Sequence, residues 1–171
     1  MNIRIRPERP GDASAVRVVL EAAFPTPTEA RLVELLRERD RVSVALVAEV
    51  DGKVVGHILF SPVSIELSEG RVEGAGLAPM AVLPAYQRQG VGTRLIEEGL
   101  PACRSAGFPF VVVLGDPDYY LRFGFLRASA FGLRNEYGVD AEFMVQELQP
   151  GGLPAGGGLV KYATEFGEAD V

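Results

Sequence analysis

The chain has 171 residues, of which 47% are hydrophobic and 23% charged, a balance typical of a folded domain and not of a disordered segment. Its formal net charge of −6 at pH 7 disfavours nucleic acid or an anionic membrane as the main partner. Its longest apolar runs have the length of strands, well below the roughly 20 residues that span a bilayer. We therefore expect one domain over residues 1–171, with no nucleic-acid or membrane partner.

Two further features point to a reducing compartment. The single cysteine, Cys103, can form no internal disulfide. The segment from Met1 to Arg6 lacks the apolar core of a secretory signal. We expect a cytoplasmic protein, in which Cys103 is a buried packing residue because it lies on the apolar side of a predicted helix.

The first forty residues predict a strand followed by two helices. Ile3 to Arg6 alternates apolar and basic residues, as a half-buried strand does. Asp12 stands where it can cap the first helix. Thr26 to Glu29 has the form of a capping box and opens the second helix.

A hairpin is predicted next. Val44 to Val50 and Val54 to Ser64 are β-branched runs joined by Asp51-Gly52, a dipeptide that favours a tight two-residue turn. His57 lies in the second run. We expect a packed or surface histidine and not a general base, because no residue near it in the sequence would orient it.

The following strand, Arg71 to Leu83, contains residues that disfavour regular pairing. Gly74 and Gly76 weaken a strand, and Pro79 has no N–H to donate to a neighbour. We therefore expect a bulge or a splayed ladder near Pro79.

A glycine loop, Gln87-Arg88-Gln89-Gly90-Val91-Gly92, then leads into a helix whose apolar residues recur from Val91 to Cys103. Glycines let the backbone approach a ligand, and the first helical N–H groups have no intrahelical acceptor. Phosphate is the expected ligand. The spacing disfavours two nucleotide motifs, because Leu95 replaces the third glycine of GxGxxG and the sequence contains no Gly-Lys-Ser/Thr.

The later elements follow in order. Pro101 falls inside the helical pattern and predicts a kink or an early end of that helix. Phe110 to Leu114 is an apolar fifth strand, and a short helix that Asp116 can cap follows it. Further strands are expected at 131–134, 142–148 and 159–162.

Two motifs resemble the GNAT superfamily of N-acetyltransferases. The loop fits Gln/Arg-x-x-Gly-x-Gly/Ala, the superfamily's pyrophosphate loop, and Tyr120 to Phe125 is similar to its Tyr-x-x-x-Gly-Phe segment, in the expected order. The resemblance extends from Ile3 to about Phe143. It implies an α/β (α+β) fold: a mixed, mostly antiparallel sheet of about seven strands, splayed at the fourth and fifth, flanked by about four helices.

The resemblance also implies a reaction and a site. Acetyl-CoA would be the cosubstrate, and its acetyl group would pass directly to a primary amine of a small molecule or a protein N-terminus. Tyr120 would protonate the departing sulfur, although Tyr119 could take that place, and Arg88 or Arg94 would add charge at the loop. No metal is implied. The implied cofactor-binding residues are Met80, Ala81, Val82, Gln87, Arg88, Gln89, Gly90, Val91, Gly92 and Thr93.

Several alternatives stay open. The general base could be Glu73, Asp116 or water, and Val113 stands where many GNAT enzymes carry an asparagine that contacts the cofactor. The alternative to an enzyme is a non-catalytic sensor of the same fold that binds CoA or an acyl-CoA. Sheet edges near the C-terminus are compatible with a homodimer. The acceptor pocket would include the first two helices, whose Glu21 and Glu29 could meet a cationic substrate or be solvated charges.

Overall fold

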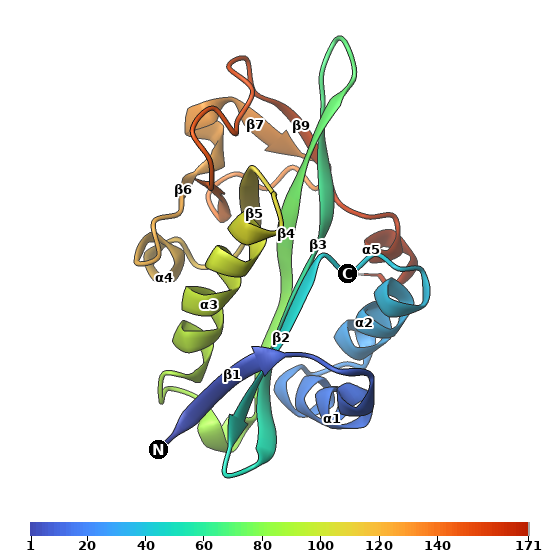
Figure 1. Ribbon diagram of the computed structural model, residues 1–171. Helices are drawn as coiled ribbons and strands as arrows, with labels where there is room; N and C mark the ends of the chain where they lie inside the picture. Colours follow the sequence, from blue (N-terminus) through green and yellow to red (C-terminus); the bar gives the residue numbers. More distant parts are fainter. Residues whose placement is uncertain (171) are drawn as a thin grey trace. The chain divides into compact units, whose positions relative to one another are not determined.

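The structure, a computed structural model, describes residues 1–170 (Figure 1). Its α-helices are α1 (Ala13–Ala23), α2 (Thr28–Glu38), α3 (Val91–Ser105), α4 (Pro117–Leu121) and α5 (Glu165–Glu168). Its strands are β1 (Ile3–Pro7), β2 (Val44–Val50), β3 (Lys53–Glu66), β4 (Arg71–Val82), β5 (Phe110–Leu114), β6 (Leu126–Arg127), β7 (Leu133–Asn135), β8 (Phe143–Glu147) and β9 (Gly158–Lys161). Short 3₁₀ turns are η1 (Pro10–Asp12), η2 (Pro84–Tyr86) and η3 (Ala128–Phe131).

These strands form one sheet in the order β1-β2-β3-β4-β5-β8-β6, and β9 pairs with both β3 and β7. The β4–β5 and β7–β9 pairs are parallel, whereas β1–β2, β2–β3, β3–β9, β5–β8 and β6–β8 are antiparallel. The predicted fold class, a mixed and mostly antiparallel sheet with flanking helices, is confirmed. The sheet of the described chain has nine strands instead of about seven. The sequence pattern did not separate β6 and β7, because two or three residues are too short to show a period.

The chain divides into two compact units, and the first contains residues 1–60, 78–99 and 164–170. In this unit β1 pairs with β2, and β2 pairs with the first part of β3 from Val50–Lys53 to Val44–Phe60. The turn between β2 and β3 has positive φ at both Asp51 (51°) and Gly52 (77°), as a tight two-residue hairpin requires. The predicted hairpin is confirmed.

Helices of the first unit bury their apolar sides. α1 and α2 lie side by side (Figure 1). Their buried residues are Val16, Val19, Leu20, Ala30, Leu32, Val33 and Leu36. The start of α3 packs on β3, where a Cβ atom at Gly56 would lie 2.8 Å from the side chain of Val91 and 3.2 Å from that of Leu95. The absence of a side chain at Gly56 therefore lets the helix that follows the loop lie against the strand.

The second unit contains residues 61–77 and 100–163. Here β4 pairs with β5 only from Ala75–Val111 to Leu77–Val113. β4 itself continues to Val82, with Pro79, which has no N–H to donate, just beyond the last pair. The predicted splay of the fourth and fifth strands is confirmed. The core of this unit includes the fully buried rings of Phe110, Phe125 and Phe143.

Three other local predictions concern the ends of helices. The early end of α3 at Pro101 does not occur, because the helix runs on to Ser105. Asp12 does not cap α1: its carboxylate accepts hydrogen bonds from Arg6 and from the backbone N–H of Arg9. The capping box at the start of α2 does not form either, since that helix has no side-chain cap.

Cys103 is buried, as predicted, and burial raises the pKa of its thiol to about 12. Such a thiol stays protonated at neutral pH and is a poor nucleophile.

Among the described residues, every helix is too short or too polar to cross a bilayer.

Candidate functional site

In the first unit, the end of β4 and the glycine loop form one continuous segment. Ala81 is buried, whereas Met80 and Val82 are only half-buried, as expected for alternate faces of a strand. Directly after the strand, the N–H of Leu83 donates to the carbonyl oxygen of Val55 in β3 at 2.8 Å. The strand end is thus fixed before the chain enters η2 and the loop.

Two glutamines tie the loop to the segment before it. The side-chain amide Nε2 of Gln87 donates to the carbonyl oxygen of Val82 at 3.0 Å, and that of Gln89 donates to the carbonyl oxygen of Ala85 at 3.0 Å. Both side chains are therefore used to shape the loop. The sequence pattern placed these glutamines in the site but did not indicate this role.

The backbone N–H groups of the loop are unpaired. Within residues 1–170, none of the six successive N–H groups from Arg88 to Thr93 donates a hydrogen bond. Pairing resumes at Arg94, whose N–H donates to the carbonyl oxygen of Gly90 at 3.0 Å. Successive free amides at the start of a helix are a favourable site for an anion, because they add to the positive end of the helix dipole.

The loop owes this shape to two residues with left-handed backbone angles. Arg88 has φ 61° and Gly90 has φ 88°. A Cβ atom at Gly90 would meet no atom within 4 Å, so glycine is favoured there by the backbone angle and not by lack of space. Turns of this kind direct successive amides toward one side, which is the arrangement that holds anions.

The two arginines near the loop, Arg88 and Arg94, differ in their contacts with the rest of the chain. Arg94 is held on the surface of α3, where it donates to Glu98 at 3.0 Å and to the carbonyl oxygen of Ile3 at 3.3 Å. Arg88 is exposed and forms no ion pair with any residue of the described chain. Of the two, Arg88 is the cation available to a ligand at the loop.

In the second unit, Tyr120 stands on α4, just after the C-terminal end of β5. It is 8% exposed, and its ring lies edge-on to the rings of Tyr119 and Phe125, with centroids 5.1 Å and 5.5 Å away. A Cβ atom at Gly115 would lie 2.3 Å from the Tyr120 ring, so this ring needs glycine at position 115. The sequence pattern does not indicate this requirement, although Gly115 opens the turn.

Burial, together with the neighbouring Tyr119, raises the pKa of Tyr120 to about 12. The phenol therefore stays protonated at neutral pH and can donate a proton. Its hydroxyl forms no hydrogen bond with the described residues, so it is not committed to a structural partner. Tyr119, in contrast, is half-buried and stacks with Phe123 and Arg122.

The two carboxylates considered as general bases have other contacts. Asp116 caps α4, with its side chain accepting the N–H of Asp118 at 3.0 Å. Glu73 is exposed, and its carboxylate lies 3.4 Å from the guanidinium of Arg71. Each contact leaves the carboxylate accessible to solvent.

His57 is fully buried in β3, in agreement with the prediction of a packed histidine. Its Nε2 atom lies 2.8 Å from Oε1 of Glu8, whose carboxylate also accepts hydrogen bonds from Arg37 at 2.7 and 3.1 Å. Burial opposes the ionisation of Glu8, but the contacts with His57 and Arg37 outweigh it and lower the pKa of Glu8 to about 2. A carboxylate therefore does lie beside His57, and it comes from a residue that is distant in the sequence.

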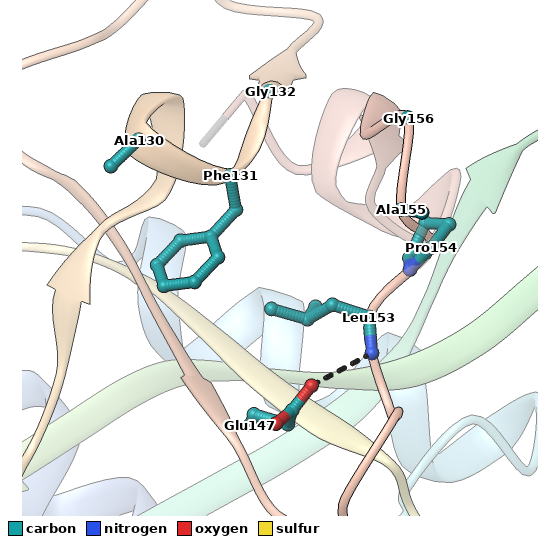
Figure 2. A pocket seen from close by; sticks show the side chains of 8 residues that line it. All are labelled: Ala130, Phe131, Gly132, Glu147, Leu153, Pro154, Ala155 and Gly156. Carbon is teal, nitrogen blue, oxygen red and sulfur yellow. Dashed lines mark hydrogen bonds between the residues drawn. The ribbon is translucent and has the colours of Figure 1, made fainter.

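A pocket of about 420 Å³ lies in the second unit, between η3 and the loop before β9 (Figure 2). The side chains of Phe131 and Leu153 point toward each other across it, and Glu147 accepts the N–H of Leu153 at 3.2 Å. Glu147 pairs with Phe110, the first residue of β5. Tyr120 packs against Gly115, which directly follows the last residue of β5. The pocket and Tyr120 therefore lie at opposite ends of β5.

A family model described as the acetyltransferase (GNAT) domain matches residues 4–128 of the chain. The chain belongs to the GNAT acetyltransferases. This GNAT protein is 38% identical over 164 residues to the uncharacterized N-acetyltransferase YhbS of Escherichia coli K12, with 95% of this chain and 97% of that protein covered. It is 43% identical over 116 residues to the uncharacterized N-acetyltransferase YjhQ of the same strain, with 67% of this chain and 64% of that protein covered.

Solved structures agree with this assignment. The crystal structure of Escherichia coli YhbS in complex with CoA has a TM-score of 0.91 and 37% identity, covering 98% of this GNAT chain and 93% of that one. A GNAT family acetyltransferase from Brucella melitensis in complex with acetyl-CoA has a TM-score of 0.79 and 39% identity, covering 96% of this GNAT chain and 98% of that one.

Proposed function

We propose that residues 1–171 form a single GNAT domain that catalyses the acetyl-CoA-dependent acetylation of a primary amine, on a small molecule or a protein N-terminus. The observation that carries this proposal is the run of free amides from Arg88 to Thr93 in a member of this family. Two of the similar structures contain CoA or acetyl-CoA, which supports acetyl-CoA as the cosubstrate. The proposed localisation is the cytoplasm.

The loop binds the pyrophosphate of acetyl-CoA in this proposal. The N–H groups of Arg88 to Thr93 donate to its oxygens, and the Arg88 side chain adds one positive charge. Gln87 acts indirectly, because its side chain holds the loop to Val82. The half-buried strand residues Met80 and Val82, with Ala81 between them, lie alongside the pantetheine arm.

Tyr120 is the proposed acid. In the reaction the amine nitrogen bonds to the acetyl carbon, the carbon–sulfur bond breaks, and the phenol gives its proton to the sulfur. The proton that the amine loses passes to water and returns to the phenolate. A phenol that burial keeps protonated at neutral pH is suited to this role.

The acceptor must lose its proton before it attacks. For a lysine-type amine with a pKa of about 10.4 this costs roughly 4 to 5 kcal/mol at pH 7, but for an α-amino group near 8 only about 1 kcal/mol. Because Asp116 caps α4 and Glu73 lies beside Arg71, we assign the base to water.

Release of free thiol from acetyl-CoA with a panel of primary amines tests the proposal. Turnover with at least one amine is expected. The second candidate, a GNAT-like sensor that binds CoA or an acyl-CoA, is favoured by Val113, which replaces the family's asparagine. A sensor would show a higher melting temperature with acetyl-CoA but no thiol release.

A further inference from the structure

A carboxylate and an exposed phenol stand together just after β7, in the second unit. Oε1 of Glu136 accepts the backbone N–H of Tyr162 at 2.9 Å. The ring of Tyr137 lies 5.8 Å from the ring of Tyr162, and Tyr137 is 42% exposed. The second oxygen of Glu136, Oε2, forms neither a hydrogen bond nor an ion pair within residues 1–170. The pair therefore presents one carboxylate oxygen and one aromatic ring to a ligand.

The loop that carries this pair is held in one conformation by Asn135. This side chain is 7% exposed, and its Oδ1 accepts the N–H groups of Tyr137 and Val139 at 2.9 and 3.2 Å. Its Nδ2 donates to the carbonyl oxygen of Val139 at 2.7 Å. A buried amide with both ends bonded to the same turn fixes the positions of Glu136 and Tyr137 before any ligand binds.

Tyr162, which contacts both Glu136 and Tyr137, lies over one face of the β4–β5 strands. The ring of Tyr162 covers Gly76, where a Cβ atom would lie 2.9 Å from Cε1 of the ring. Gly76 pairs with Val112, and a Cβ atom at the neighbouring Gly74 would touch the ring of Phe110 at 2.4 Å. This face of the parallel pair thus carries Phe110, Val112 and the Tyr162 ring.

Tyr120 lies over the opposite face of the sheet, at the end of β5. Its ring packs on Gly115, which extends the pairing of β5, since its N–H donates to the carbonyl oxygen of Glu142 at 2.9 Å. Because side chains alternate along a strand, position 115 shares its face with Val111 and Val113, not with Val112. The Tyr120 ring and the Tyr162 ring, which is the one that Glu136 and Tyr137 contact, therefore lie on opposite faces of the sheet. Gly76 is one residue before Leu77, where β4–β5 pairing ends.

We propose that Glu136 and Tyr137 form the acceptor subsite and that the acceptor is a primary amine with a second positive charge. This inference rests on the proposed acetyl transfer. The leaving sulfur is next to Tyr120, so the amine approaches from the other face of the strands. A carboxylate beside an aromatic ring favours an ammonium group.

Acid–base chemistry explains why the acceptor needs a second positive charge besides its reacting amine. An ammonium held by the Glu136 carboxylate is stabilised in its protonated form and cannot attack a thioester. The group bound at Glu136 is therefore not the reacting amine, and a diamine satisfies both requirements: one end remains charged at Glu136 while the other end reacts.

Steady-state thiol release with three five-carbon acceptors tests the subsite. These are 1,5-diaminopentane, n-pentylamine and 5-aminopentanoate, whose far ends are positive, neutral and negative. The wild type is expected to have the lowest KM for the diamine and the highest for the amino acid. Glu136→Gln should raise KM for the diamine about tenfold and leave kcat, and KM for pentylamine, unchanged.

The variant keeps the fold, because the glutamine amide oxygen can still accept the N–H of Tyr162. Glu69→Gln, at an exposed turn position, is the matched control and should leave all three KM values unchanged. Equal KM values for the three acceptors, or a diamine KM that Glu136→Gln does not change, would overturn the subsite.

Calorimetry distinguishes failure of the proposed reaction from failure of the subsite. If the wild type releases no thiol with any amine, the transferase assignment fails and the subsite is judged by titration of 1,5-diaminopentane alone. Weaker binding to Glu136→Gln than to the wild type and Glu69→Gln would then support the subsite. Equal binding to all three proteins, or no binding to the wild type, would overturn it.

Discussion

At the scale of single residues, the position of the Tyr120 hydroxyl is decided by a neighbour that has no side chain. The ring occupies the space that a Cβ atom at Gly115 would need, since the two would be 2.3 Å apart. The role proposed for Tyr120 therefore depends on Gly115 as a positioning residue.

Two substitutions test this dependence. Tyr120→Phe removes the proton donor, so kcat should fall at least tenfold while the affinity for acetyl-CoA is nearly unchanged. Gly115→Ala displaces the ring and should lower kcat in the same direction, also with little change in cofactor affinity. Tyr119→Phe is the control. An unaltered rate in Tyr120→Phe would remove this tyrosine from the mechanism.

The contact between Glu8 and His57 predicts how stability depends on pH. The pKa of Glu8 falls from its ordinary value of 4.5 to about 2 in the folded protein. The carboxylate therefore stabilises the fold fully above pH 4.5, and this contribution is lost as the pH falls from 4.5 toward 2. Asp12, whose pKa Arg6 lowers from 3.8 to about 2, loses its contribution as the pH falls from 3.8 toward 2.

Chemical denaturation at a series of pH values checks this expectation. Glu8→Gln should unfold more easily than the wild type at pH 7, and the difference should shrink as the pH falls below 4.5. A difference that is constant from pH 7 to pH 2 would show that the charge of Glu8 does not stabilise the fold.

At the scale of elements, the loop between β4 and α3 is the critical segment, and its geometry depends on Gly90. Alanine at this position would have to adopt φ 88°, which costs on the order of 1 to 2 kcal/mol. Gly90→Ala should therefore lower the melting temperature and weaken acetyl-CoA binding, because relief of the strain would move the free amides.

Gly11→Ala is the matched control, because a Cβ atom there also meets nothing within 4 Å and its φ is not in the left-handed region. Its melting temperature and cofactor affinity should stay close to those of the wild type. If Gly90→Ala binds acetyl-CoA as tightly as Gly11→Ala, the loop conformation is not needed for binding.

Elements with local signals could be predicted from the sequence. The Asp51–Gly52 hairpin and the splay at Pro79 depend on backbone preferences of a few adjacent residues, and both are present. The capping of α1 could not be predicted this way, because Arg6 competes for the Asp12 carboxylate.

In the candidate site, too, features set by adjacent residues could be predicted and features set by distant contacts could not. The glycine pattern placed the loop, but the hydrogen bonds of Gln87 and Gln89 and the engagement of Arg94 by Glu98 depend on how the chain folds back on itself. The contact between Glu8 and His57 also joins residues far apart in the sequence. Contacts of this kind leave no short-range pattern.

At the scale of the whole molecule, two properties help to define the acceptor: membership of the GNAT acetyltransferases and the net charge of −6. The family supplies the class of reaction, whereas the charge favours cationic acceptors through long-range attraction. The complexes of two similar proteins, one with CoA and one with acetyl-CoA, concern the cosubstrate only. The acceptor has to be identified from the residues particular to this chain.

Cofactor binding by the free amides is tested most directly by the amide NMR spectrum of residues 88–93 during titration with acetyl-CoA, compared with the acetyl thioester of pantetheine, which lacks the pyrophosphate. We expect acetyl-CoA to shift the N–H signals from Arg88 to Thr93, as new hydrogen bonds form, and the pantetheine thioester to leave them in place. Binding of acetyl-CoA with these six signals unmoved, or no binding at all, would contradict it.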